Sequence, residues 1–127
     1  LLIQPDKRPK LVEIGSSLEE MQAVVGGDIE EYMPFEDDAA IICNEEGKMT
    51  GLPLNRAIYD GHTHEMLDIV AGDFFIAYAP IESEKFLSLP KEMADKYAKM
   101  FKNPERFFRT DDGIKAIPVS PTKDKER

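Results

Sequence analysis

The stretch Phe74-Phe75-Ile76-Ala77-Tyr78-Ala79 is the strongest strand candidate in this chain of 127 residues. Aromatic and β-branched residues favour strands, and consecutive apolar residues point to both faces of a sheet. A second stretch, Ala39-Ala40-Ile41-Ile42-Cys43, is also apolar on both faces and predicts a central strand. These two stretches therefore indicate the sheet around which the rest of the chain is organised.

Two helices are predicted, one before and one after these strands in the sequence. Ser17 and Glu20 form a capping-box pattern, and apolar residues then recur at helical spacing until Gly26. Ser88 is the predicted cap of the second helix, which ends at Asn103-Pro104. Weaker strand candidates lie at residues 1–4, 10–14, 29–33, 58–59 and 66–70, with a hairpin turn at residues 44–47. This order predicts an α+β fold, in which a mostly antiparallel sheet carries both helices on one face.

The length and the cysteine content limit the class of protein. We predict one α+β domain over residues 1–109 and a polar C-terminal extension over residues 110–127. Cys43 is the single cysteine, so no internal disulfide can form, and a reducing, cytoplasmic location is expected. No apolar run approaches the roughly 20 residues that a membrane helix needs, so no membrane association is expected.

Charge is unevenly distributed along the chain. The formal net charge is −9, and residues 11–47 contain eleven acidic residues and no Lys or Arg. Such a segment repels phosphates, so direct nucleic-acid binding is not expected. The acidic segment is interpreted either as a solvated surface or as a surface that contacts a protein partner. A DNA mimic is the alternative, although eleven acids match the charge of only about 19 Å of duplex.

No catalytic signature is present. Cys43 ends an apolar run and has no nearby base, which favours a buried, unreactive thiol. His62 and His64 would share one face of a strand, but neither their spacing nor that of other ligands matches a known zinc site. The clustered carboxylates belong to polar turns and not to apolar pockets. We therefore predict no catalytic residue, no metal ion and no cofactor.

Four polar residues near the middle of the chain are the candidate binding residues: Asn44, Glu45, Asn55 and Arg56. Arg56 is the only base between Lys48 and Lys85. One interpretation is structural: Arg56 pairs with a carboxylate such as Asp60 or Asp68, and Asn55 bonds the backbone of a turn. The other interpretation is an anchor for an anion or carboxylate on a partner.

Five blocks of residues carry a resemblance to a known family: Gly26–Glu30, Pro34–Asp38, Ile41–Lys48, Gly51–Ala57 and Asp68–Phe75. Through these blocks, about half of the chain resembles the family catalogued as domain of unknown function 3846. Its most specific blocks are Asn-Glu-Glu-Gly and Gly-Leu-Pro-Leu-Asn-Arg. The resemblance implies an uncharacterised accessory protein of Gram-positive gut bacteria and their mobile elements, with no established activity. Members typically have acidic or aliphatic residues where His62 and His64 stand, which further disfavours a metal site.

Two classes of function remain open from the sequence. The first is a non-enzymatic protein-binding module that is encoded by a mobile element. Its contact surfaces would be the acidic segment and the adjacent residues Asn55 and Arg56. The second is a small ligand-binding protein or enzyme that uses Arg56, Asn55 and Cys43. The second class requires these side chains to line one concave pocket, with at least one of them titrating abnormally.

Overall fold

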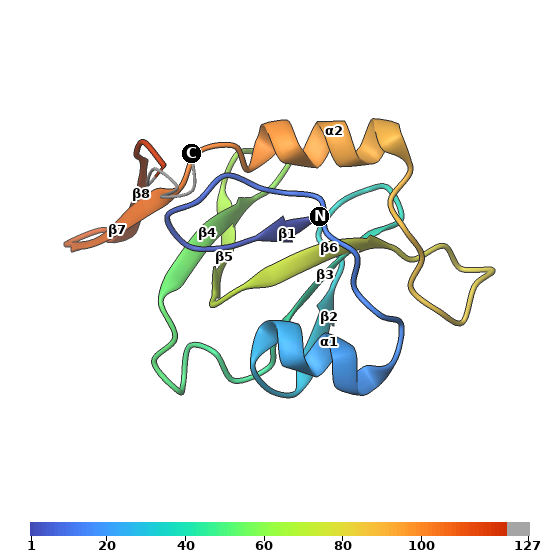
Figure 1. Ribbon diagram of the computed structural model, residues 1–127. Helices are drawn as coiled ribbons and strands as arrows, with labels where there is room; N and C mark the ends of the chain where they lie inside the picture. The colour runs from blue at the N-terminus through green and yellow to red at the C-terminus, as the bar shows by residue number, and fades with distance from the viewer. Residues whose placement is uncertain (122–127) are drawn as a thin grey trace.

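The computed structural model describes residues 1–121, and the part of the predicted extension beyond Pro121 lies outside it. Residues 1–121 form two helices and eight strands, consistent with the predicted α+β class (Figure 1). The elements are β1 Leu2–Ile3, α1 Leu18–Val25, β2 Ile29–Tyr32, β3 Ala39–Asn44, β4 Leu54–Tyr59, β5 Met66–Ala71, β6 Phe74–Tyr78, α2 Lys91–Met100, β7 Glu105–Thr110 and β8 Gly113–Pro118.

The core of the molecule is a four-stranded antiparallel sheet with the order β1-β6-β3-β2. The two stretches that predicted the sheet form its inner strands, β3 and β6, which pair with Ile41 opposite Ile76. Short segments cover the outer edge of β6: Leu1 bonds Ile76, and Leu87 bonds Tyr78. The prediction of a central, doubly apolar strand is confirmed for residues 39–43.

The two helices lie on opposite faces of this sheet, as Figure 1 shows. Ala39, Ile41 and Cys43 of β3 face the cluster that includes Tyr97 of α2 and the following Phe101. The alternate residues, Ala40 and Ile42, face the cluster formed with Met21 and Val25 of α1. The prediction that both helices share one face is wrong, because a strand that is apolar on both sides needs cover on both sides.

A second, two-stranded sheet of β4 and β5 packs on the same face as α2, where Ile58 and Val70 join its core cluster. The polar turn after β3 therefore does not close a hairpin within the main sheet. Instead it carries the chain through turns at residues 45–51 into β4. The chain re-enters the main sheet at Gly72, whose φ of +80° favours glycine. A Cβ there would also lie 2.7 Å from Leu52 Cδ1.

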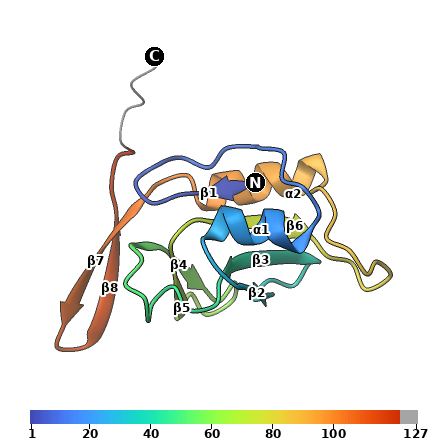
Figure 2. The ribbon, with the colours of Figure 1, turned by 60° about the horizontal axis from the view of Figure 1, so that its bottom comes forward.

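The last two strands form a hairpin that projects from the body (Figure 2). β7 and β8 pair over six positions as a separate two-stranded sheet, and β7 contacts β4. The predicted boundary between residues 109 and 110 falls inside this hairpin. The polar composition after Thr110 conceals a strand because the hairpin is largely exposed on both faces.

The helix starts differ in how well the sequence predicted them. At α1 the Ser17 cap forms as expected: Glu20 N donates to Ser17 Oγ at 3.1 Å, and Gly26 ends the helix with a φ of +82°. The other half of the capping box differs, because Glu20 Oε1 accepts the Ser17 hydroxyl at 2.8 Å in place of the Ser17 amide. At α2 the cap position belongs to Pro90, which has extended backbone and offers no side-chain acceptor. The predicted Ser88 cap is therefore wrong, and the helix begins at Lys91.

A buried tyrosine of α2 connects this helix to the loop before β3. Tyr97 is fully buried, and its hydroxyl donates to Asp37 Oδ1 at 2.6 Å. Burial acts to raise the pKa of Asp37, but hydrogen bonds from Tyr97, Lys96 and the amide of Ala39 outweigh it, so the pKa is lowered. The ionised carboxylate is therefore the form that the folded state stabilises.

We expect Tyr97→Phe to reduce the free energy of unfolding by about 1–2 kcal/mol at neutral pH, because a charge-assisted hydrogen bond is lost. The folded-state pKa of Asp37 lies below its unfolded value. Its contribution is therefore present above the unfolded pKa and is lost as the pH falls through the folded pKa. The difference between wild type and Tyr97→Phe should shrink over this acidic range. Urea unfolding at several pH values measures this difference.

Tyr59→Phe is the matched control, because Tyr59 is largely exposed and its hydroxyl makes no hydrogen bond within residues 1–121. We expect it to leave stability unchanged. A loss for Tyr97→Phe that is constant down to strongly acidic pH would contradict the proposed role of the Asp37 carboxylate.

Candidate functional site

The turn that follows β3 contains two of the predicted binding residues, Asn44 and Glu45. The Asn44 amide donates to the carbonyl of Val25 at the end of α1, and its Oδ1 accepts the amide of Glu46 at 2.8 Å. A Cβ on Gly27 would lie 2.8 Å from Asn44 Nδ2. Asn44 therefore holds the turn against α1, whereas the Glu45 side chain is exposed.

This turn forms one wall of a polar groove of about 290 Å³ between β2–β3 and β5. Lys48 Nζ bonds Asp68 Oδ1 at 2.6 Å across it, and Glu30, Tyr32 and Cys43 lie along it. The groove thus brings together two of the four predicted binding residues, Asn44 and Glu45. The other two lie elsewhere.

Asn55 and Arg56 are buried in the interior of the protein. Their side chains are 1% and 0% exposed. The Asn55 amide donates to the carbonyls of Ile3 and Gly72 at 3.0 and 2.8 Å, which confirms the expectation of a backbone-binding asparagine. The interpretation of this pair as a surface that contacts a partner is wrong, because a buried side chain cannot reach one.

The Arg56 guanidinium bonds carbonyl oxygens and not a carboxylate, so the predicted pairing with Asp60 or Asp68 is also wrong. Nε and Nη2 donate to the Phe101 carbonyl at 3.2 and 3.0 Å, and Nη2 also donates to the Lys7 carbonyl at 2.7 Å. Nη1 donates to Asn55 Oδ1 at 2.8 Å. Because Phe101 is the C-cap of α2, the charge also sits at the negative end of a helix dipole.

The electrostatic balance of this site includes Glu105, the first residue of β7. Burial lowers the pKa of Arg56, and the charges of Glu105 and Asp6 oppose that effect. Burial likewise raises the pKa of Glu105, against the amide of Ala57, which donates to its Oε1 at 2.8 Å, and against the charge of Arg56. Arg56 and Glu105 together attach β4 to the hairpin and to the end of α2.

We expect Arg56→Lys to reduce the free energy of unfolding by about 3–5 kcal/mol, because one ammonium cannot replace a forked guanidinium and leaves buried carbonyls unpaired. Arg109→Lys, at an exposed position of the hairpin, is the matched control and should be neutral. Chemical denaturation followed by circular dichroism measures both. Equal stability of the two variants would show that the buried Arg56 guanidinium does not stabilise the fold.

The residues of the ligand-binding or enzyme interpretation do not gather in one pocket. Cys43 lines the polar groove, Asn55 and Arg56 are turned toward backbone carbonyls, and His62 lies at an exposed turn, where its Nε2 contacts Glu36. This contact and the Asp60 charge raise the pKa of His62. Within residues 1–121, no group of three or more His, Cys, Asp or Glu residues is placed to hold a metal ion.

Cys43 is buried, and burial together with the charges of Glu30 and Asp68 raises the pKa of its thiol to about 11. The thiol is therefore protonated at neutral pH and is a weak nucleophile.

We expect the Cys43 thiol of native protein to react with a disulfide reagent such as DTNB more than tenfold more slowly than that of urea-unfolded protein. The reaction rate of the native protein should rise with pH up to pH 11. Equal native and unfolded rates at neutral pH would contradict the buried thiol.

The acidic residues of the first third are distributed over both faces of the main sheet. Glu30 pairs with Cys43 on the α2 side, whereas Glu31 pairs with Ile42 on the α1 side. Glu20 lies in the first turn of α1, where its Oε1 accepts the Ser17 hydroxyl, whereas Asp37 accepts the Tyr97 hydroxyl of α2. A DNA mimic requires its charges on one face, and this arrangement does not provide that.

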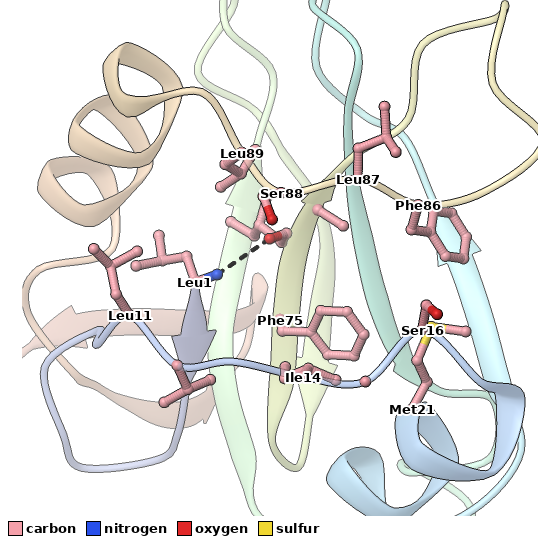
Figure 3. Close-up of a pocket in the computed structure, with 14 residues that line it drawn as sticks. Leu1, Leu11, Ile14, Ser16, Met21, Phe75, Phe86, Leu87, Ser88 and Leu89 are labelled. Carbon is pink, nitrogen blue, oxygen red and sulfur yellow. Dashed lines mark hydrogen bonds between the residues drawn. The ribbon is translucent and has the colours of Figure 1, made fainter.

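A second groove, which is mainly apolar, lies beside β6 and was not predicted from the sequence. Its volume is about 440 Å³, and it lies between residues 11–16 and residues 86–89 over Phe75 (Figure 3). Leu11 is 74% exposed and Leu87 is 43% exposed at its walls. Residues 10–14 were predicted to be a strand. Only Lys10 makes a bridge to Leu2, so the apolar residues that follow remain outside the sheet.

The structure is thus a small α+β domain with two separate grooves. The family model for a domain of unknown function, DUF3846, matches residues 1–102, and the chain belongs to that family. No curated protein and no solved structure matches the chain. None of the helices in residues 1–121 is long and apolar enough to cross a membrane.

Proposed function

We propose that this chain is a non-enzymatic accessory module that binds another protein. The observation that carries the proposal is the apolar groove beside β6, where Leu11, Val12 and Leu87 expose apolar surface together. Isolated exposed apolar residues are ordinary, but a group of them along a groove is typical of a binding surface. The polar groove around Glu45 is a separate surface, which shares no lining residue with the apolar groove.

The groove suits an extended peptide segment of the partner. Residues 11–15 are neither helix nor strand, and within residues 1–121 their backbone groups make no hydrogen bond. An extended peptide can pair with such a segment through its backbone while its side chains enter the apolar groove. This arrangement needs neither a nucleophile nor a cofactor, which agrees with the unreactive thiol of Cys43.

The proposed cellular location and genetic context of the protein follow from its sequence. A chain with one cysteine and no expected disulfide is suited to the cytoplasm, which we propose as its location. An accessory role on a plasmid or phage is consistent with the family resemblance. We do not propose a DNA mimic, because the acids occupy both faces of the sheet. Nor do we propose an enzyme that uses Arg56, Asn55 and Cys43, because these side chains do not converge.

Affinity capture from the native host tests the proposal, with the wild type compared with Leu11→Glu. We expect wild type to retain one protein in near-stoichiometric amount and Leu11→Glu to weaken its binding roughly tenfold or more, because the substitution places a charge in the apolar contact. Leu11 is largely exposed, so the fold should be unaffected. Quantitative mass spectrometry of the captured protein measures the difference.

Leu67→Glu is the matched control, since Leu67 is an exposed leucine of β5 that does not line the groove. It should capture the partner as wild type does. Failure to recover a partner in several growth states would count against a binding module. Equal capture by Leu11→Glu would place the contact elsewhere on the molecule.

A further inference from the structure

The projecting hairpin of β7 and β8, residues 105–118, is called the arm below. It lies beyond residues 1–102, over which the family model matches. In residues 1–121 its strands pair only with each other, and Phe108, Ile114 and Ile117 are 51%, 42% and 50% exposed. A two-stranded hairpin is marginally stable in water unless further strands or a packed face support it. The arm is therefore an incompletely covered element.

The arm combines apolar and basic side chains on one face. Because Arg106 pairs with Ile117 and Phe108 pairs with Lys115, these four residues lie on the same side of the hairpin. The arm as a whole carries three basic and three acidic residues, with Asp111 and Asp112 confined to its tip. This net charge of zero is too small to hold a nucleic acid. The face instead suits a protein edge that combines acidic and apolar residues.

Such an edge exists on the chain itself, at β2. This strand has the sequence Ile29-Glu30-Glu31-Tyr32 and pairs only with β3 among residues 1–121, so its outer edge is open. Glu30 and Glu31 are exposed, and residues 11–47 contain no Lys or Arg. An unprotected strand edge is a template for pairing with another strand. The arm projects away from the main sheet, so it cannot reach β2 of its own molecule (Figure 2).

We propose that β8 of one molecule adds to the β2 edge of a second copy of this chain. Aligned antiparallel, the sequence Ile114-Lys115-Ala116-Ile117 matches β2 in chemistry: Lys115 is opposite Glu31, and the two isoleucines are opposite Tyr32 and Ile29. Opposite charges and apolar pairs are the cross-strand contacts that stabilise antiparallel sheets. If each arm meets the edge of the other molecule, the contact is self-complementary and closes as a dimer.

Sedimentation velocity of the full chain tests this dimer with two charge-reversal variants. Arg106→Glu/Lys115→Glu makes the arm acidic, and Glu30→Lys/Glu31→Lys makes the edge basic. We expect each variant alone to raise the dimer dissociation constant roughly tenfold or more, because like charges then face each other. The equimolar mixture should form a heterodimer again, since acidic arms meet basic edges and basic arms meet acidic edges. Added salt should weaken the wild-type dimer.

Matched variants change the same number of charges elsewhere. Lys91→Glu/Lys99→Glu on α2 and Glu82→Lys/Glu84→Lys in the loop after β6 involve exposed residues and should leave the dimer intact. Circular dichroism confirms that every variant is folded. The mixture is informative even if one variant is less stable, because only complementary charges restore the complex.

Three results would overturn the proposal: a wild type that stays monomeric at all concentrations, a mixture that fails to associate, or matched variants that dissociate the dimer as strongly. Binding of duplex DNA by monomeric wild type that Arg106→Glu/Lys115→Glu abolishes would also overturn it, because the arm would then recognise a nucleic acid. This test involves neither Leu11 nor the apolar groove, so it can fail while the proposed protein-binding function holds.

Discussion

The guanidinium of Arg56 joins parts of the chain that are far apart in the sequence. It donates to the carbonyls of Lys7 in the N-terminal loop and Phe101 after α2, and to the side chain of Asn55 beside it. These contacts fix the β4–β5 sheet against the segment that carries β1 and against the end of α2. Because the Phe101 carbonyl would otherwise be buried without a donor, the position of the end of α2 against β4 depends on this side chain.

A buried positive charge without a carboxylate in contact is costly unless several dipoles replace its water. Here the replacement comes from carbonyl oxygens, from the C-terminal end of α2 and from the more distant charge of Glu105. The same arrangement explains where the arm begins. Glu105 accepts the amide of Ala57 next to Arg56, so the first residue of β7 is tied to β4, while the strands beyond it extend into solvent.

The sequence predicted the parts of the fold that depend on local pattern. Residues 39–43 and 74–79 are apolar at consecutive positions, which identifies inner strands, and Ser17 identifies the start of α1. Helical spacing shows which side of a helix is apolar but not which face of the sheet the helix covers. The prediction that both helices lie on one face was therefore wrong. The role of Arg56 could not be predicted either, because two of its acceptors, the carbonyls of Lys7 and Phe101, are backbone atoms 49 and 45 residues away.

The blocks that carry the family resemblance serve the architecture more than a surface. Asn44 holds a turn against α1, Asn55 and Arg56 are buried, and a Cβ on Gly47 would lie 3.0 Å from the Ala71 carbonyl. Similarity in these blocks therefore indicates a shared fold, as similarity among core residues usually does, and does not identify a binding or catalytic site. The exposed leucines of the proposed binding groove, Leu11 and Leu87, and the arm lie outside these blocks, although the floor of the groove at Phe75 belongs to one of them. Similarity in the core blocks therefore carries no information on what these exposed residues bind.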